Sequence, residues 1–225
     1  MDDVCTELTL GGLFVGRPAP LVDGEREVLS AIRKERVAAG EVELSATQLA
    51  GDRQADMVSH GGPDKAVYMY PAAHYPFWRS LGYELEPGGV GENASVTGPD
   101  ESEVRIGDVW EWGGALVQVS QPRSPCFKFG MRLGRKQAVA QMIESARSGW
   151  YLRVLRTGPV PTGGGLRLVE RDATAPTVRE LFTGSFARGA DNDPARLREM
   201  IGTPALAGQW RYAIEGKLAR LEARR

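Results

Sequence analysis

The chain has 225 residues, of which 42% are hydrophobic and 25% are charged, as is usual for a soluble globular protein. This length suits one large domain, or one domain with a small appendage. Two cysteines far apart in the sequence exclude a disulfide framework and favour a reducing, cytoplasmic setting. We expect neither secretion nor membrane insertion, because no signal peptide pattern opens the chain and no apolar run reaches the ~18 residues of a membrane span.

Short strands dominate the first three quarters of the chain. Hydrophobic patterning predicts strands over residues 4–10, 27–37, 41–44, 66–70, 104–112, 115–119, 150–155 and 165–170. Gly113-Gly114 predicts a hairpin turn, and residues 16–26 and 84–103 read as loops. Helices are expected only over 71–82 and 136–147. Many short strands with irregular connections predict a mainly β fold, as a barrel or a folded sheet.

The character of the sequence changes near Arg171, where helix signals replace strand signals. Thr177 and Glu180 have the spacing of a capping box. Asp193-Pro194 and Thr203-Pro204 each place an N-cap residue before a proline, which is typical of a helix start. The last helix carries an apolar stripe of Leu206, Trp210, Ile214, Leu218 and Leu221. We therefore predict two domains, a β domain over 1–170 and a three-helix unit over 171–225.

The net charge of −1 conceals an asymmetry between the halves of the chain. Residues 1–120 have a net charge of −11, and residues 121–225 have a net charge of +10. This difference in charge would be explained if the two halves attract each other, or if the charged residues simply lie on surfaces that face the solvent. The cations nevertheless cluster around Cys126, which indicates a local anion site, for instance for a phosphate. Neither a domain-wide basic excess nor a nucleic-acid-binding module is present, so we do not expect nucleic acid as a partner.

Cys126 lies in the segment Ser120 to Gly130, a proline-containing loop after an apolar strand. Neighbouring cations favour its thiolate, which attacks electrophiles or binds soft metals. A peptidase-like nucleophile with His60 or His74 as its base, and an inert buried cysteine, are the alternatives. Two histidines and two cysteines without ligand-pair spacing make a structural zinc site improbable.

A glycine turn, His60 to Lys65, offers backbone N–H groups to a ligand, although it could equally be a plain turn between strands. This turn and the Cys126 loop lead to a family resemblance. The chain resembles the MOSC domain in three motifs with the same order and spacing. They are HGGPDKAVY at 60–68, GEN at 91–93 and SQPRSPC at 120–126. The resemblance is strong over residues 40–170, and with the helical tail it covers nearly the whole chain, which looks most like the stand-alone YiiM subfamily.

The resemblance implies a MOSC-type β-barrel with few helices, followed by the small three-helix unit, and a bound molybdenum cofactor of the molybdopterin type. It implies that Cys126 is the molybdenum ligand and catalytic centre. It also makes cofactor-binding candidates of eight residues: His60, Asp64, Lys65, Glu92, Asn93, Gln121, Arg123 and Lys128. Arg123 and Lys128 are the candidates for phosphate or pterin contact.

The function implied by the resemblance is reduction of N-hydroxylated compounds, such as hydroxylaminopurines and amidoximes, to amines or amidines. Two cysteines cannot ligate an iron–sulfur cluster through four thiolates, so we expect an external electron donor of the ferredoxin or flavodoxin type. A sulfur carrier with a Cys126 persulfide and a non-catalytic cofactor-binding protein are the alternatives. The helical tail would form either a wall of the pocket or a homodimer surface.

Overall fold

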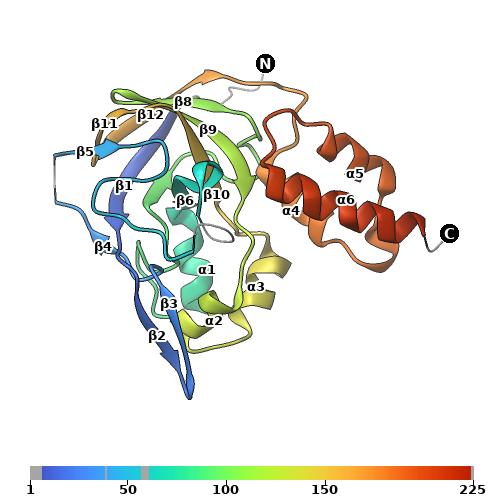
Figure 1. Ribbon diagram of the computed structural model, residues 1–225, viewed down its shortest axis with the longest axis horizontal. Coiled ribbons are helices and arrows are strands. Elements are labelled where there is room, and N and C mark those ends of the chain that lie inside the picture. The colour runs from blue at the N-terminus through green and yellow to red at the C-terminus, as the bar shows by residue number, and fades with distance from the viewer. Residues whose placement is uncertain (1–6, 39, 57–60, 224–225) are drawn as a thin grey trace.

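The computed structural model describes residues 7–38, 40–56 and 61–223, and its central feature is a closed β-barrel (Figure 1). Seven strands close the barrel in the order β12-β8-β9-β10-β6-β7-β1, and β1 pairs with β12 to complete the ring. All of these pairings are antiparallel except β6 with β7. The closure leaves no open edge between the seven strands. The prediction of a mainly β barrel is confirmed.

The strands are short, as the sequence predicted. The barrel is formed by β1 (Glu7–Val15), β6 (Val67–Pro71), β7 (Ala94–Thr97), β8 (Val109–Trp112), β9 (Ala115–Pro122), β10 (Trp150–Arg156) and β12 (Gly164–Glu170). Smaller pairings outside the barrel involve β2 (Ala19–Asp23), β3 (Arg26–Ser30), β4 (Glu35–Arg36), β5 (Glu41–Leu44) and β11 (Gly158–Pro161).

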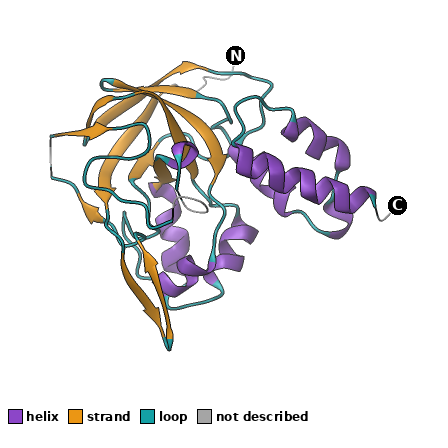
Figure 2. Cartoon of the chain, in the orientation of Figure 1, coloured by secondary structure: helices purple, strands orange, loops and turns teal. Residues whose placement is uncertain are grey.

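The helices form two groups on different sides of the barrel (Figure 2). One group lies near the β2–β3 hairpin and comprises α1 (Tyr75–Ser80), α2 (Phe127–Leu133) and α3 (Ala138–Ser145). The other is the C-terminal group of α4 (Val178–Phe186), α5 (Pro194–Ile201) and α6 (Gly208–Glu222). Single 3-10 turns are η1 (Pro63–Lys65), η2 (Ala72–His74) and η3 (Gly189–Asp191). No helix within the described ranges has the length and apolarity needed to cross a bilayer.

The C-terminal helices pack onto the barrel through a shared core. Phe182 of α4 and Trp210 and Ile214 of α6 belong to the same buried cluster as Trp110 and Val119 of the barrel. The apolar stripe predicted for the last helix is therefore core packing, and its five members all lie in or against this cluster. The capping box of Thr177 and the Asp193 cap are present as predicted.

A second buried cluster joins α1, α2 and α3 to the barrel strand β6. It is aromatic: the indole of Trp78 packs edge-on against Tyr83 and Phe129, and its N–H donates a hydrogen bond to Tyr70. This cluster fixes the start of α2 at Phe127, and so it fixes the position of the cysteine directly before it.

Several elements differ from the sequence predictions. Strands β2 and β7 lie in segments expected to be loops, β11 and α2 were not predicted, and α6 begins at Gly208 instead of near Thr203. The three strands pair with β3, β1 and β6, and β5 respectively. For β7 and β11 these partners are distant in sequence, so tertiary pairing overrides a weak local propensity for strand.

Candidate functional site

Cys126 is the residue around which the site is built. It follows β9 and stands at the N-cap position of α2, and it is half-buried. Two cavities meet at it, because Lys65, Ser124, Cys126 and Tyr151 line both. Cys126 thus borders two differently built spaces.

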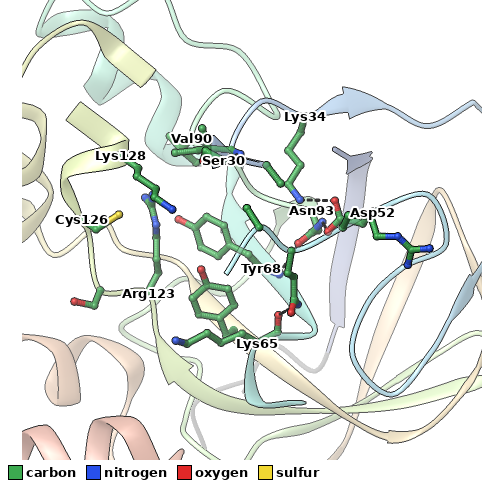
Figure 3. Close-up of a pocket in the computed structure, with 18 residues that line it drawn as sticks. Ser30, Lys34, Asp52, Lys65, Tyr68, Val90, Asn93, Arg123, Cys126 and Lys128 are labelled. Carbon is green, nitrogen blue, oxygen red and sulfur yellow. Dashed lines mark hydrogen bonds and ion pairs between the residues drawn. The ribbon is translucent and has the colours of Figure 1, made fainter. Parts of the chain in front are cut away.

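The first cavity has a volume of about 110 Å³ and a cationic lining. Of the residues that line it, five are cations and one is a carboxylate. The cations come from distant parts of the chain, and they are Lys34, Arg53, Lys65, Arg123 and Lys128. All of them except Arg53 are labelled in Figure 3. Such a concentration of positive charge in a recess attracts anions.

The carboxylate of this cavity, Asp52, is already engaged by other groups of the protein. Its Oδ1 accepts hydrogen bonds from the Gly16 N–H at 2.7 Å and the Lys34 Nζ at 2.5 Å. Its Oδ2 accepts one from the Asn93 side chain at 2.9 Å. Asp52 is 3% exposed, and burial lowers the pKa of Lys34 although the carboxylate opposes this shift. Asp52 therefore compensates one lysine, and the lining keeps a positive excess.

Arg123 is the most buried cation of the first cavity, at 6% exposure. Its guanidinium lies 4.6 Å from the ring centroid of Phe129 and 5.2 Å from that of Tyr68. One of its nitrogens contacts the Met142 sulfur at 3.5 Å. Within the described ranges, no carboxylate forms an ion pair with it. A desolvated guanidinium held by rings and a sulfur is prepared for an anionic ligand.

Two tyrosines and one lysine complete the polar wall. Burial raises the pKa of Tyr68 and of Tyr151, so both phenols stay protonated at neutral pH. Tyr68 donates to the Ser148 carbonyl at 2.8 Å. Burial lowers the pKa of Lys65, and its Nζ donates a hydrogen bond to the Gln209 side chain of α6. Lys65 thereby connects the barrel to the C-terminal helices at the junction of the cavities.

The second cavity, of about 470 Å³, is lined by residues of the barrel and of helices α4 and α6. Its barrel side includes Gln121 and Tyr151, and its helix side includes Phe186, Trp210 and Ile214. Among the described residues that line it, none is acidic. The space is larger than the first cavity, and it combines an apolar helix wall with the cations Lys65, Lys217 and Arg220.

Most of the predicted site residues lie at these cavities. Asn93, Arg123 and Lys128 line the first, Gln121 lines the second, and Lys65 and Cys126 line both. The side chains of Lys65, Asn93, Arg123, Cys126 and Lys128 can be followed in Figure 3. His60 lies outside the described residues, so its predicted role stays a prediction.

Two predicted residues line neither cavity in the described part of the chain. The Asp64 carboxylate accepts a hydrogen bond from the Arg153 Nε at 2.8 Å. Glu92 is fully buried and accepts hydrogen bonds from the Gly88 N–H, at 2.6 Å, and from the Tyr75 hydroxyl. These contacts indicate that Glu92 supports the loop that carries Asn93, and burial raises the pKa of its carboxyl.

His74, which the sequence offered as a base for Cys126, lies elsewhere. It is buried, its Nε2 is 2.7 Å from a Glu101 carboxylate oxygen, and it lines neither cavity. Glu101 also accepts the Gly149 N–H at 2.6 Å. These bonds tie together the two segments before β8 and β10, so we interpret His74 as a structural residue.

Lys34, Tyr68 and Tyr151 line the first cavity although the sequence did not single them out. Lys34 belongs to a segment that reads as a strand, and the two tyrosines belong to strands that read as core. Among the cations of this cavity, Lys65, Arg123 and Lys128 carried a local signal, because they lie in or next to the family motifs. No sequence pattern shows which side chains of a strand will line a cavity.

Comparisons with known proteins agree with this architecture. The MOSC domain model matches residues 56–167. "Protein YiiM" of Escherichia coli (strain K12) is 36% identical over 207 residues, covering 90% of this chain and 89% of that protein. A protein named "Reductase" from Gibberella moniliformis is 39% identical over 152 residues, covering 64% of this chain but 26% of that longer protein. The crystal structure of YiiM from Geobacillus stearothermophilus superposes with a TM-score of 0.75 at 29% identity, covering 94% of this chain and 99% of that one.

Proposed function

Since this chain belongs to the MOSC-domain family, we propose that it binds a molybdenum cofactor and reduces N-hydroxylated compounds to amines or amidines. One observation carries the proposal: a small cation-lined cavity and a larger cavity with an apolar helix wall meet at the single cysteine of the Cys126 loop. An oxidoreductase of this kind needs a site for an anionic cofactor beside a site for an organic substrate. The soft thiolate ligand that molybdenum requires stands between the two.

The residues present fit the anionic part of the cofactor. A volume of about 110 Å³ is below the ~300 Å³ at which small-molecule pockets begin, so this space suits a phosphate group better than an entire pterin. Arg123, without a carboxylate partner in the described chain, and Lys128 would hold that group. The Cys126 thiolate would ligate the metal, and the bound cofactor would then supply a two-electron redox centre.

The reaction balances with electrons from outside the protein. Reduction of R–NHOH with two electrons and two protons yields R–NH2 and water, with cleavage of the N–O bond. We propose a ferredoxin- or flavodoxin-type donor, because two cysteines cannot hold a four-thiolate cluster. This chain matches only part of a longer protein named "Reductase". That match supports an arrangement in which a separate protein or domain supplies the electrons and this chain reduces the substrate.

Lys65 is the residue best placed to deliver a proton. It lines both cavities, and burial lowers its pKa, which makes its ammonium a stronger acid. Its bond to Gln209 holds the ammonium at the junction. We assign Lys65 as the general acid that protonates the leaving oxygen.

Metal analysis and a turnover assay test the proposal together. Protein made in a molybdenum-replete host should contain about one molybdenum per chain and should reduce a hydroxylamine with an artificial reductant. Cys126→Ser should abolish turnover, whereas Cys5→Ser, which changes the other cysteine, should leave it intact. A Cys126→Ser variant with full activity would contradict the proposal.

The same preparations distinguish two other functions. A sulfur carrier would show the mass of a persulfide on Cys126 and no turnover. A protein that only binds the cofactor would contain molybdenum but would fail both the turnover assay and the persulfide assay. Either result would replace the reductase as the function of the site.

A further inference from the structure

Positive charge near Cys126 extends beyond the first cavity onto the outer surface. Four cations of this region line neither cavity, and they form a group that we call the α2 patch: Arg33, Arg132, Arg135 and Lys136. Three of them are exposed, and Arg132 is half-buried. The proposed cofactor site therefore makes no use of these four cations.

The α2 patch begins at the rim of the first cavity. Lys128, which lines that cavity, and Arg132 lie four residues apart in α2, so their side chains share one face of the helix. Burial lowers the pKa of Arg132, and the charge of Arg33 lowers it further, so these two guanidinium groups are close. Arg132 follows Cys126 by six residues, which corresponds to roughly 9 Å along the helix. A partner on the patch would thus approach the cysteine closely.

Little negative charge compensates the α2 patch. Within the described ranges, none of its four cations forms an ion pair with a carboxylate, and the buried Nε of Arg132 has no hydrogen-bond partner. Arg132 and Arg135 line a hollow of about 350 Å³, and Glu84 is the single acidic residue in its described lining. Like charges without counter-charges at a surface attract an acidic partner.

The position of the patch favours a protein as that partner. Its exposed cations lie outside the cavities, where a large molecule can reach them. Helix α2 belongs to the group beside the β2–β3 hairpin, whereas α4 and α6, which line the second cavity, lie on a different side of the barrel (Figure 1). A protein bound at the patch would therefore leave the second cavity open. Transient redox complexes bury little surface and are steered by charge.

We propose that the α2 patch docks an acidic one-electron carrier protein, whose carboxylates pair with Arg132 and its cationic neighbours. The proposal rests on the proposed function, because a carrier is needed only if the Cys126 site is a redox centre. Each encounter oxidises one carrier by one electron. Two encounters therefore supply the two electrons that, with two protons, break one N–O bond and release one water.

Two reductants separate docking from chemistry. The holoprotein is assayed on N-hydroxybenzamidine with reduced flavodoxin, an acidic protein, and with the methyl viologen radical, a small cation. Arg132→Gln combined with Arg135→Gln should lower kcat/KM for flavodoxin about tenfold and leave the methyl viologen rate unchanged. The loss should shrink as the salt concentration rises from about 0.05 M to about 0.5 M. Arg167→Gln combined with Arg198→Gln, which removes two cations already in ion pairs elsewhere on the surface, is the control.

Single substitutions test the patch with less change to the protein. Lys136→Gln alters one exposed side chain and should lower kcat/KM for flavodoxin in the same direction by a smaller factor. Glu84→Gln should have the opposite effect, because it removes the carboxylate of the hollow, and kcat/KM for flavodoxin should rise roughly twofold.

Binding of oxidised flavodoxin, followed by NMR titration of the full chain, distinguishes this proposal from the proposed function. Binding that weakens in the Arg132 and Arg135 double variant supports the docking surface even in protein without molybdenum or turnover. The docking surface is overturned if the unaltered chain binds no flavodoxin, or if the control pair loses as much binding. Equal losses of rate with flavodoxin and methyl viologen would also overturn it, because the cations would then act on the chemistry instead of on docking.

Discussion

The two cavities that meet at Cys126 differ in origin as well as in chemistry. The first is small and cationic, and its described walls come from the barrel and from elements next to it, including the end of β3 and the start of α2. The second is about four times larger, and one of its walls consists of helices α4 and α6. The comparison indicates that the barrel supplies the anion site, while the C-terminal helices add a space for an organic molecule.

This comparison predicts that Arg123 serves the first cavity and contributes little to folding. Arg123→Met should weaken binding of the anionic cofactor by about 3 to 5 kcal/mol, because an anion would then face a buried apolar wall. We expect the purified variant to lack molybdenum. Its free energy of unfolding should stay within about 1 kcal/mol of the unaltered protein, since a desolvated charge without a carboxylate partner is removed.

Molybdenum analysis and urea unfolding measure these two effects separately. Arg135→Met is the matched control, because Arg135 lies over Tyr83 and lines neither cavity. It should retain the metal. An Arg123→Met protein with full molybdenum content would show that the cationic cavity is not the cofactor site.

Lys65, at the junction of the two cavities, should control the alkaline limb of the pH–rate profile. Burial lowers its pKa below the ordinary 10.5, so the rate should fall as pH rises through this lowered value and the acid loses its proton. Lys65→Met should reduce kcat roughly 100-fold and remove that limb. Lys136→Met, at an exposed lysine, should keep it. A Lys65→Met profile with an unchanged alkaline limb would exclude Lys65 as the acid.

Glu92 should have the smallest effect, because it lies behind the wall of the first cavity. Burial raises its pKa above the ordinary 4.5, so the folded state holds the proton more tightly than the unfolded state. Stability from this group should therefore be lost as pH rises from about 4.5 through the raised value. Glu92→Gln should flatten that dependence in urea unfolding and change stability by about 1 kcal/mol or less at acidic pH.

Molybdenum content decides between the two roles of Glu92. The family resemblance predicts a cofactor contact, whereas its bonds to Gly88 and Tyr75 indicate support of the loop. Retention of the metal by Glu92→Gln would favour support, and loss of the metal would favour contact. Glu86→Gln, at a carboxylate whose side chain is 79% exposed, is the control for the change of charge.

Local sequence patterns were sufficient to predict the elements whose hydrogen-bonding partners are close in the sequence. The β8–β9 hairpin across Gly113-Gly114, the capping box at Thr177 and the cap at Asp193 were all predicted and are present. The prediction was wrong for β7, whose four residues pair with β1 and, in parallel, with β6. The glycine-rich segments on either side give no strand pattern, and the strand is stabilised by partners 25 to 88 residues away in the sequence.

The sequence by itself determined the thiol, its cationic neighbours and the family to which the chain belongs. It could therefore nominate Cys126, Arg123 and Lys65 as members of one site. Only the tertiary structure decided that Lys34 and Tyr68 join them, that Asp64 and Glu92 face other partners, and that Gln121 opens onto a separate cavity. The physical reason is that barrel closure and helix packing set which side chains meet across long stretches of chain, whereas sequence patterns record mainly the neighbours within a turn or a hairpin.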